Sequence, residues 1–216
     1  MRRIAALLLS LALTLATPVA AQQKEPIGPF AIDLRGAFGR HKAEPSVATD
    51  LGVTATNLPT RTYGLAGGVH VYPLRSRRVT LGLGGNFVTT RGSRSLEMQT
   101  GTATEPVEGP VVRRRFTTFS PEISLNFGHR DGWSYISGGM FGRSKLYLDR
   151  EDDPVRNPPF RSTINYGGGA RWFTSDHIAF SVDFRWYSVA EQAAGDGVIA
   201  QPRTTLLILS GGISFK

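Results

Sequence analysis

The sequence lacks cysteine altogether, which excludes disulfides and thiolate metal sites. Histidine is also scarce: there are four, and no two of them have the spacing of a metal-ligand pair. After residue 16 there is no second long apolar run, and the mean hydropathy is slightly polar, at −0.15. A membrane-spanning helix needs about 20 apolar residues, so none is expected in the rest of the chain. Stability must come from strand pairing and packing, and no cofactor, metal site or catalytic cluster is predicted.

The first residues have the pattern of a secretory signal peptide. Arg2 and Arg3 precede an apolar run from Ile4 to Ala16, and the small residues Val19 and Ala21 stand before the expected cleavage point after Ala21. Cleavage would remove both arginines and lower the formal charge from +8 to +6. An uncleaved membrane anchor fits less well because the run is short. The predicted organisation is a signal peptide over residues 1–21 and one domain over residues 22–216.

Strand alternation is clearest between Asn165 and Tyr187, which we interpret as a hairpin. In its second arm, Ser181, Asp183 and Arg185 alternate with the apolar residues Ile178, Phe180, Val182, Phe184 and Trp186. A period of two defines a strand with two unlike faces. The polar face carries paired charges and glycines instead of the long flexible side chains of a wet surface. This pattern favours a membrane barrel, with apolar groups toward lipid and a confined polar interior.

The same alternation predicts eight strands, at Phe30–His41, Thr62–Leu74, Arg78–Thr90, Phe116–Gly128, Trp133–Leu148, Ile164–Trp172, Ile178–Tyr187 and Thr204–Lys216. The links after the odd strands are long and polar, at Lys42–Arg61, Arg91–Arg115, Asp149–Thr163 and Ser188–Arg203, whereas the links after the second, fourth and sixth strands are short. Such alternation is typical of a barrel whose two ends face different compartments. The predicted fold class is all-β, an eight-stranded antiparallel up-and-down transmembrane β-barrel, with no helix in the mature chain.

Two strands carry irregular features. The strand Trp133–Leu148 has two competing apolar phases, so its lipid face stays open at this point. Pro121 removes a ladder hydrogen bond and predicts a bulge near the rim of the barrel. Glycine pairs or triplets also recur inside five strands, at 67–68, 84–85, 138–139, 167–169 and 211–212. In a narrow, strongly coiled barrel, small interior residues leave room for large ones.

Three stretches carry a resemblance to a known family: the signal ending TPVAAQQ, the segment INYGGGARWFTSDHIAFSVDFRWY and the terminal GGISFK. Together with the strand pattern of the mature chain, they resemble the small eight-stranded OmpA/OmpX-type outer-membrane barrels of Gram-negative bacteria. The resemblance implies a membrane protein of the outer membrane and cell envelope, with no catalytic signature. One feature departs from the family, because such barrels usually end on an aromatic residue and here Phe215 is followed by Lys216.

Charges of both signs fall on the inward phase of the strands, namely Asp33, Arg35, Glu122, Arg171, Asp183 and Arg185. Buried charges are tolerable only when paired and hydrogen-bonded. An eight-stranded interior is just wide enough to be filled by side chains. We therefore expect an interior plugged by a salt-bridge network, and a small gated pore or ligand pocket is the alternative.

A basic cluster lies near the second long link and consists of Arg91, Arg94, Arg113, Arg114 and Arg115. In a membrane these arginines would lie level with the phosphates of lipopolysaccharide, which guanidinium groups bind well; a solvated loop is the plainer alternative. Nucleic acid also binds positive patches, but an exported protein rarely meets it, so no nucleic-acid partner is expected. Of the histidines, His41 alone falls at the outer end, in the inward phase, where a hydrogen-bonded rim position is expected instead of catalysis.

The preferred function is that of an integral outer-membrane barrel with a structural or adhesive role through its long outer loops, because loops on a rigid scaffold commonly carry binding. The alternative from another class is a soluble periplasmic lipocalin-like carrier of a small apolar ligand, which would show charge outside and hide its apolar face. An acyl-modifying membrane enzyme needs polar groups on the lipid-facing outer rim, and the pattern shows none. The expected partners are membrane lipid, lipopolysaccharide and an unknown extracellular ligand, and the protein is expected to be a monomer.

Overall fold

The computed structural model describes residues 25–76, 79–98, 107–153, 158–195 and 198–216, and the predicted signal peptide lies outside them. Each strand pairs antiparallel with its neighbours in the sequence, and β1 also pairs with β8, which closes the barrel. The strands are β1 (Phe30–Arg40), β2 (Arg61–Arg75), β3 (Thr80–Met98), β4 (Val107–His129), β5 (Gly132–Arg150), β6 (Arg161–Phe173), β7 (Ile178–Val189) and β8 (Thr204–Phe215). The predicted fold class is confirmed.

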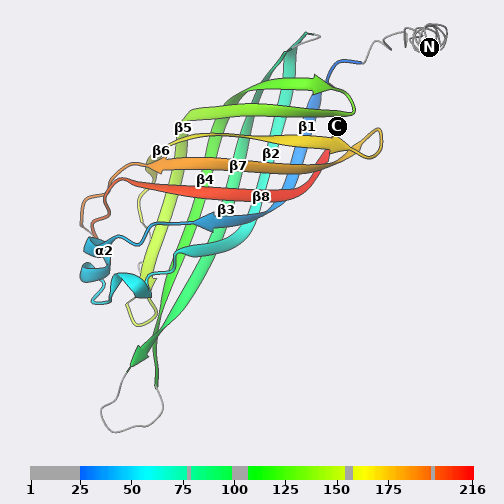
Figure 1. Cartoon of the computed structure of the whole chain (residues 1–216). Coiled ribbons are helices and arrows are strands. Elements are labelled where there is room, and N and C mark those ends of the chain that lie inside the picture. The colour runs from blue at the N-terminus through cyan, green and yellow to red at the C-terminus, as the bar shows by residue number, and fades with distance from the viewer. Residues whose placement is uncertain (1–24, 77–78, 99–106, 154–157, 196–197) are drawn as a thin grey trace, which may run out of the picture.

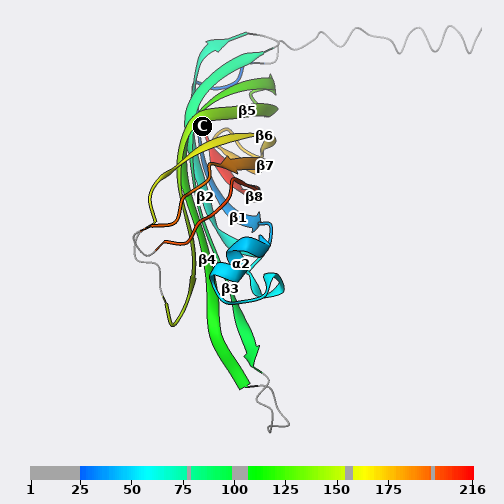
Figure 2. The ribbon, with the colours of Figure 1, turned by 90° about the vertical axis from the view of Figure 1, so that its left-hand side faces the viewer.

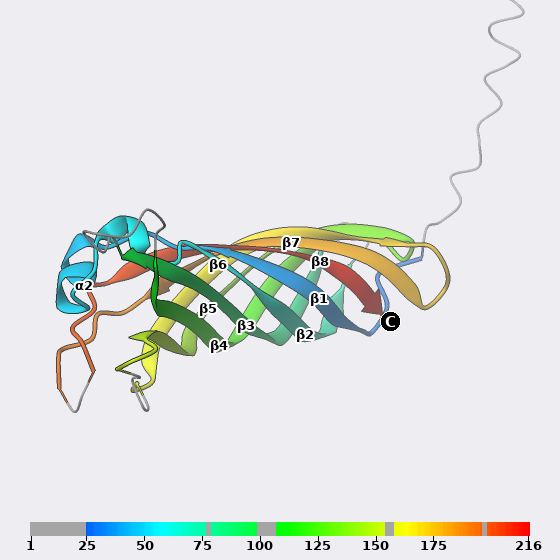
Figure 3. The same ribbon diagram turned by 90° about the horizontal axis from the view of Figure 1, so that it is seen from below.

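The two ends of the barrel differ in their links (Figure 1). The links after β2, β4 and β6 are short and lie at the same end as the C-terminus. The links after β1, β5 and β7 lie at the opposite end, where β3 also ends and β4 begins, and we call it the loop end. Seen from below, the barrel separates α2 (Pro45–Asp50) from the C-terminal end (Figure 3). The predicted alternation of long and short links is therefore confirmed.

The segment Arg91–Arg115, expected as a loop, is mostly strand. β3 continues to Met98 and β4 begins at Val107, and the ladder between them includes the pairs Arg91↔Arg115 and Ser93↔Arg113. β3 has 19 residues and β4 has 23, against the roughly 9–11 that suffice to span a membrane. The hairpin projects beyond the other strands at the loop end (Figure 2). Its outer part has polar residues on both faces, which removes the alternation by which a strand is recognised in a sequence.

The exterior of the barrel is apolar. Large hydrophobic side chains are exposed on the outer face of β1, β2, β4 and β7, among them Leu34 at 55%, Val69 at 53% and Phe180 at 62%. The side chains between them in the sequence face inward and are buried, in strict alternation along β1 and β7. A closed sheet that exposes such a belt satisfies its own backbone groups and requires lipid around it.

A bulge explains the two competing phases of β5. Trp133 and Tyr135 point inward, Met140 and Phe141 are both exposed, and the inward residues from there on are Leu146 and Leu148. The β5–β6 register shifts between Gly139 and Gly142. The apolar phase therefore changes once along the strand, and each of the two sequence patterns describes one half of it.

The bulge expected at Pro121 is present but not at the rim. The β4–β5 register shifts between Phe119 and Ile123, and Pro121 has a ladder partner only on the β3 side, at Gly85. It lies next to Glu122 in the middle of the barrel wall, directly across from the irregular part of β5. The β4–β5 ladder is interrupted at this point, so no β5 residue is left there without a hydrogen-bond donor. The lack of an N–H group in proline therefore costs no ladder hydrogen bond.

The interior is filled in successive layers from the short-turn end to the loop end. The first apolar layer contains Ile27, Ala31, Tyr72, Trp133 and Tyr135. Charged residues form the next layer, and a second apolar layer follows, with Phe116, Tyr187, Val189, Leu206 and Ile208 among its members. At the loop end, Val47, Ala48 and Leu58 cover the mouth together with Val112 and Leu148.

The cover at the loop end corrects the expectation that the mature chain has no helix. The link after β1 holds the six-residue helix α2 and a 3-10 turn, η1 (Ala55–Asn57), with Pro45 at the first turn of the helix. Such short elements leave little periodicity in a sequence, and packing onto the barrel stabilises them. No helix in the described residues is long and apolar enough to cross a membrane.

Candidate functional site

The six charged residues expected inside the barrel lie together in the middle of its interior. Each is at most 4% exposed, and the set consists of Asp33 and Arg35 on β1, Glu122 on β4, Arg171 on β6, and Asp183 and Arg185 on β7. One part is a two-pronged pair, in which Nε of Arg171 lies 2.9 Å from Oδ1 of Asp33 and Nη2 lies 2.5 Å from Oδ2. Ser214 also donates to Asp33. This geometry is the strongest that an arginine and a carboxylate can adopt.

Arg185 is the centre of a second group. It donates to Asp183 through Nε at 2.8 Å and through Nη2 at 3.0 Å. Its Nη1 donates to Glu122 and, at 3.2 Å, to Oδ1 of Asn165. One guanidinium group thus ties β7 to β4 and β6 across the barrel interior.

Tyr135 and Arg35 join the two groups. The Tyr135 hydroxyl donates to Oδ2 of Asp183 at 2.7 Å and accepts from Nη1 of Arg35 at 3.0 Å. The Arg35 guanidinium lies 3.5 Å from the carboxylates of both Asp33 and Asp183. Sequence reasoning missed Tyr135 because the alternation left undecided which side of β5 faces inward. Tyr135 is two residues from Trp133 and so lies on the same face, and this spacing was the signal that could have identified it.

His70 is a further member that the sequence placed in the interior without assigning it a role. Its Nδ1 lies 3.7 Å from Oδ2 of Asp33, and its Nε2 lies 3.6 Å from Oε2 of Glu122. The His70 ring thus lies between one acid of each of the two groups. The position of His70 between two acids depends on the register of neighbouring strands, which cannot be inferred from the alternation in the sequence.

Glycines opposite the large network residues make the layer possible. Cross-strand partners pair Arg35 with Gly212, His70 with Gly84 and Arg185 with Gly167. A Cβ added at Gly84 would lie 2.5 Å from the His70 ring, and one at Gly167 would lie 2.9 Å from Cγ of Arg185. The prediction that interior glycines leave room for large side chains is confirmed, because each of these large side chains occupies the space that a side chain of its cross-strand glycine would need.

Both mouths of the barrel are covered by side chains. At the short-turn end, Ile27 is buried against the first apolar layer, and Lys216 donates to the backbone carbonyl of Arg130 while its Nζ lies 3.7 Å from the centre of the Phe173 ring. Burial lowers the pKa of Lys216. The terminal lysine that departs from the family pattern thus folds over the barrel end.

His41 lies at the loop end, just beyond β1, in the rim position that was expected. It is 7% exposed, and its Nε2 lies 3.0 Å from Oγ1 of Thr62. Burial lowers the pKa of His41 to about 3, and the positive charge of Arg114 contributes to the shift. The imidazole is therefore neutral at physiological pH, and no acidic partner of a catalytic group is seen among its described contacts.

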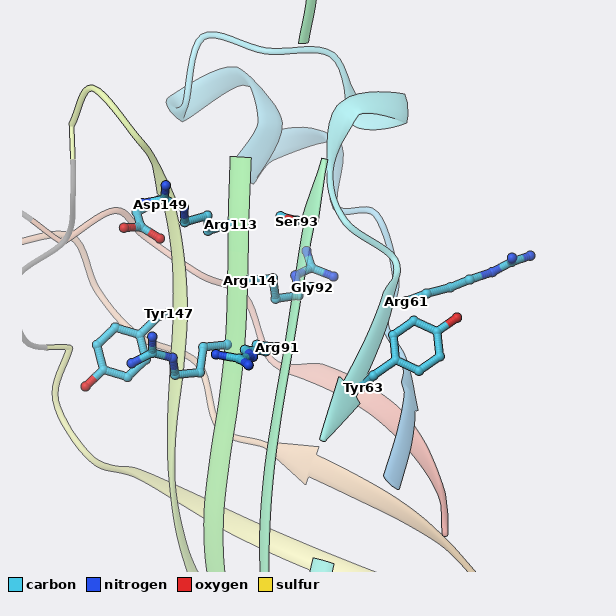
Figure 4. A pocket seen from close by; sticks show the side chains of 10 residues that line it. Arg61, Tyr63, Arg91, Gly92, Ser93, Arg113, Arg114, Tyr147 and Asp149 are labelled. Carbon is cyan, nitrogen blue, oxygen red and sulfur yellow. The ribbon is translucent and has the colours of Figure 1, made fainter. Parts of the chain in front are cut away.

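The five arginines of the basic cluster divide between two faces. Arg91, Arg113 and Arg115 are exposed on the outer face and border an open groove of about 970 Å³ (Figure 4). Arg114 also borders this groove, but it is 5% exposed and its Nη1 donates to the Lys42 carbonyl at 3.2 Å. Arg94 pairs with Val112 on the ladder and so shares the face of Arg114.

Two further arginines on the outer face were missed by sequence reasoning. Arg40 and Arg61 are exposed and stand directly opposite each other on β1 and β2. Arg61 borders the same groove, as Figure 4 shows. Both lie at strand ends and face outward. Arg40 is an even number of residues from Leu34 and Phe38, so the alternation of the strand could have placed it on the outer face. We call Arg40 and Arg61, together with Arg91, Arg113 and Arg115, the outer arginine face.

Metal chemistry receives no support from the geometry, because no group of three or more His, Asp and Glu side chains in the described part of the chain is placed to hold a metal ion. The acids of the interior are bound to arginines. The arrangement can instead neutralise buried charge and cross-link strands inside the barrel, and it can present positive charge outside.

Closure, the apolar belt and the paired polar interior together define an eight-stranded transmembrane β-barrel. No family model matches the chain, and no curated protein matches it in sequence. Solved structures do match: the outer-membrane protein OprG from Pseudomonas aeruginosa is 9% identical with a TM-score of 0.50, over 89% of this chain and 97% of that chain. Neisserial surface protein A is 9% identical with a TM-score of 0.49 (87% and 96%).

Ail, the attachment invasion locus protein of Yersinia pestis, is 16% identical with a TM-score of 0.47, over 88% of this chain and 99% of that chain. At these identities the likeness concerns the fold alone. The resemblance to small OmpA/OmpX-type barrels, seen first in the strand pattern, is confirmed as a likeness of fold by the closed eight-stranded barrel and by the match to OprG.

Proposed function

We propose that the protein is an integral outer-membrane barrel with a structural or adhesive role, in which the interior is a plug and the outer loops are the contact surface. One observation carries the proposal: the barrel is closed and apolar outside, while its interior is filled by ion-paired side chains. A barrel of this kind has no room inside for a substrate or cargo, so its contacts with other molecules must be made from outside. The loop end offers a large surface for such contacts.

The proposal includes export by the signal peptide, cleavage after Ala21, and insertion as a monomer among membrane lipid and lipopolysaccharide. The extracellular ligand of the loops is not specified by any motif. The lipocalin-like carrier is disfavoured because its polarity is opposite: a carrier buries an apolar cavity and exposes charge, whereas this barrel buries charge and exposes apolar side chains. No catalytic role is proposed.

Electrophoresis of a washed membrane fraction, with and without boiling in SDS, tests the membrane assignment. A compact barrel resists SDS until it is heated, so the unboiled band should migrate differently from the boiled band. Recovery of the protein in the soluble fraction, with no shift on heating, would disprove the assignment. Single-channel recording in a planar bilayer tests the plug, because discrete openings of the native chain would support a small pore instead.

A further inference from the structure

Like charges stand directly opposite each other on the outer arginine face. Arg91 on β3 is the ladder partner of Arg115 on β4, and Arg40 on β1 is the ladder partner of Arg61 on β2. All four side chains are exposed on the outer side of the barrel. Directly opposed residues have Cβ atoms about 4.5–5.5 Å apart, and like charges in this position destabilise a sheet. Two such pairs in neighbouring parts of one wall call for an anion between them.

Two acidic residues lie near this face, and one of them binds Arg113. Arg113 lies opposite Asp149 on the ladder and binds Oε1 of Glu151 at 2.5 Å. Among the described residues, Arg40, Arg61, Arg91 and Arg115 form no ion pair with a carboxylate, and Arg115 instead lies 5.7 Å from the centre of the Tyr147 ring. Within the described part of the chain, one outer arginine is therefore paired with a carboxylate, and the two opposed pairs are not, although Asp149 borders the same groove.

The Arg91–Arg115 pair lies in a row that marks the membrane boundary. Along neighbouring strands the ladder runs from Tyr63 to Arg91, Arg115 and Tyr147. Tyrosines gather at the level of lipid headgroups, where one end of the ring is apolar and the other is wet. The arginine pair between them thus stands at the height of headgroups, beside the 970 Å³ groove (Figure 4).

Hydroxyl groups lie next to this pair on the side toward the membrane centre. Thr89 and Thr117 share a hydrogen bond of 3.1 Å and, together with Gly64, line a second outer groove of about 400 Å³ that also borders Arg91 and Arg115. Hydroxyls in the lipid-facing phase are expensive to leave in hydrocarbon. They suit a polar headgroup whose charged part reaches the arginines and whose apolar part continues down the barrel.

From these observations we propose that the outer arginine face binds the phosphate groups of an outer-leaflet glycolipid of the lipopolysaccharide type. Arg91 and Arg115 hold one phosphate above the Thr89–Thr117 shelf, and Arg40 and Arg61 hold a second. The inference rests on the proposed function, since it requires the barrel to stand in an outer membrane with its loop end outside. It refines the cluster seen in the sequence, because Arg94 and Arg114 are not part of this site.

A binding experiment on the full-length mature barrel, folded in octyl glucoside micelles that contain no phosphate, tests the proposal. Purified lipopolysaccharide is titrated against the native chain, the R91Q/R115Q variant and the R40Q/R61Q variant, and the titration is repeated with enzymatically dephosphorylated lipopolysaccharide. The control variant is R75Q/R203Q, which loses the same charge at two exposed arginines outside the face. The heat-dependent gel shift is recorded for every chain to show that each barrel is folded.

Each pair variant should bind lipopolysaccharide about tenfold more weakly than the native chain, as expected for two exposed charge-assisted contacts. The control should bind like the native chain, and the dephosphorylated lipid should bind all four chains weakly and equally. The opposed arginines also predict an effect without lipid. Because R91Q/R115Q removes a like-charge repulsion, this variant should unfold at a higher urea concentration than the native chain.

Equal affinity of the pair variants and the control would overturn the proposal, and so would equal binding of the dephosphorylated lipid. Competition by heparin or by free inorganic phosphate at the concentration at which lipopolysaccharide binds would reassign the face to polyanions in general and overturn the lipid assignment. A barrel that gives the gel shift but fails these tests refutes this inference only, whereas a chain without the shift refutes the membrane function itself.

Discussion

Replacing Arg185 by methionine should destabilise the barrel more than any change of an exposed arginine. The variant removes four contacts, two to Asp183, one to Glu122 and one to Asn165. Asp183 would keep the Tyr135 hydroxyl at 2.7 Å, but Glu122 would keep only His70, at 3.6 Å. Breaking one side of a buried pair costs about 3–5 kcal/mol because an uncompensated charge stays buried. We expect a loss near the lower end, since Asp183 remains partly satisfied.

Urea unfolding of the barrel in lipid vesicles, followed by tryptophan fluorescence, measures this loss. The matched control is R113Q, because Arg113 is 52% exposed and its pair with Glu151 should contribute no more than about 1 kcal/mol. The double variant R185M/E122Q removes one charge of each sign, so the interior stays balanced. It should be more stable than the sum of the two single losses predicts, by roughly 0.5–3 kcal/mol.

The reasoning would be refuted by a loss below about 1 kcal/mol for R185M, equal to that of R113Q. Such a result would mean that water reaches the buried acids and solvates them, and the interior would then not be a plug. Planar-bilayer recording of the same variant gives an independent reading, because an interior that admits water should also conduct ions.

Two further perturbations test the rim and the glycine positions. Because burial lowers the pKa of His41 to about 3, from an ordinary value near 6.5, the folded barrel holds the imidazole neutral and should lose stability as the pH falls below 6.5. The loss attributable to His41 should be about 2 kcal/mol at pH 5, and H41Q should remove that part of the pH dependence of urea unfolding; equal losses in both chains would contradict the assignment. Gly169→Ala should cost about 1–3 kcal/mol, since its Cβ would lie 2.2 Å from the Val182 carbonyl oxygen and 2.7 Å from the Tyr135 hydroxyl. Gly211→Ala, with its nearest neighbour at 3.8 Å, should unfold at the native temperature in a thermal scan. Equal unfolding temperatures of the two alanine variants would exclude steric crowding at Gly169.

The fold could be predicted because its physical causes are local in the sequence. A lipid-facing strand must alternate every two residues, as Ile178 to Trp186 do, and links on the two sides of a membrane differ in length. Parity alone then placed Asp33, Arg171 and Asp183 inside. No comparison of distant residues was needed for these steps, and the fold class was confirmed.

The remaining features depend on register and on irregular backbone, which alternation does not reveal. The bulge in β5 reverses parity after Gly139, and this hid Tyr135 and the inward side of Leu146. The position of His70 between two acids follows from pairings across three strands. The sequence also grouped Arg114 with Arg113 and Arg115 because they are adjacent, although neighbouring residues on a strand point to opposite faces.

Arginine stands in two contrasting settings in this barrel, and the contrast argues for a ligand outside. Inside, three arginines meet three carboxylates, and Arg171 and Arg185 each bind one by two parallel hydrogen bonds. Outside, at the loop end, two pairs of arginines face each other, and none of the four forms an ion pair with a carboxylate among the residues that the structure describes. A surface that needed charge only for solubility would mix both signs, as Arg113 and Glu151 do. In the proposed membrane orientation the opposed pairs lie at the height of lipid phosphates, and this is the observation on which the proposed glycolipid site depends.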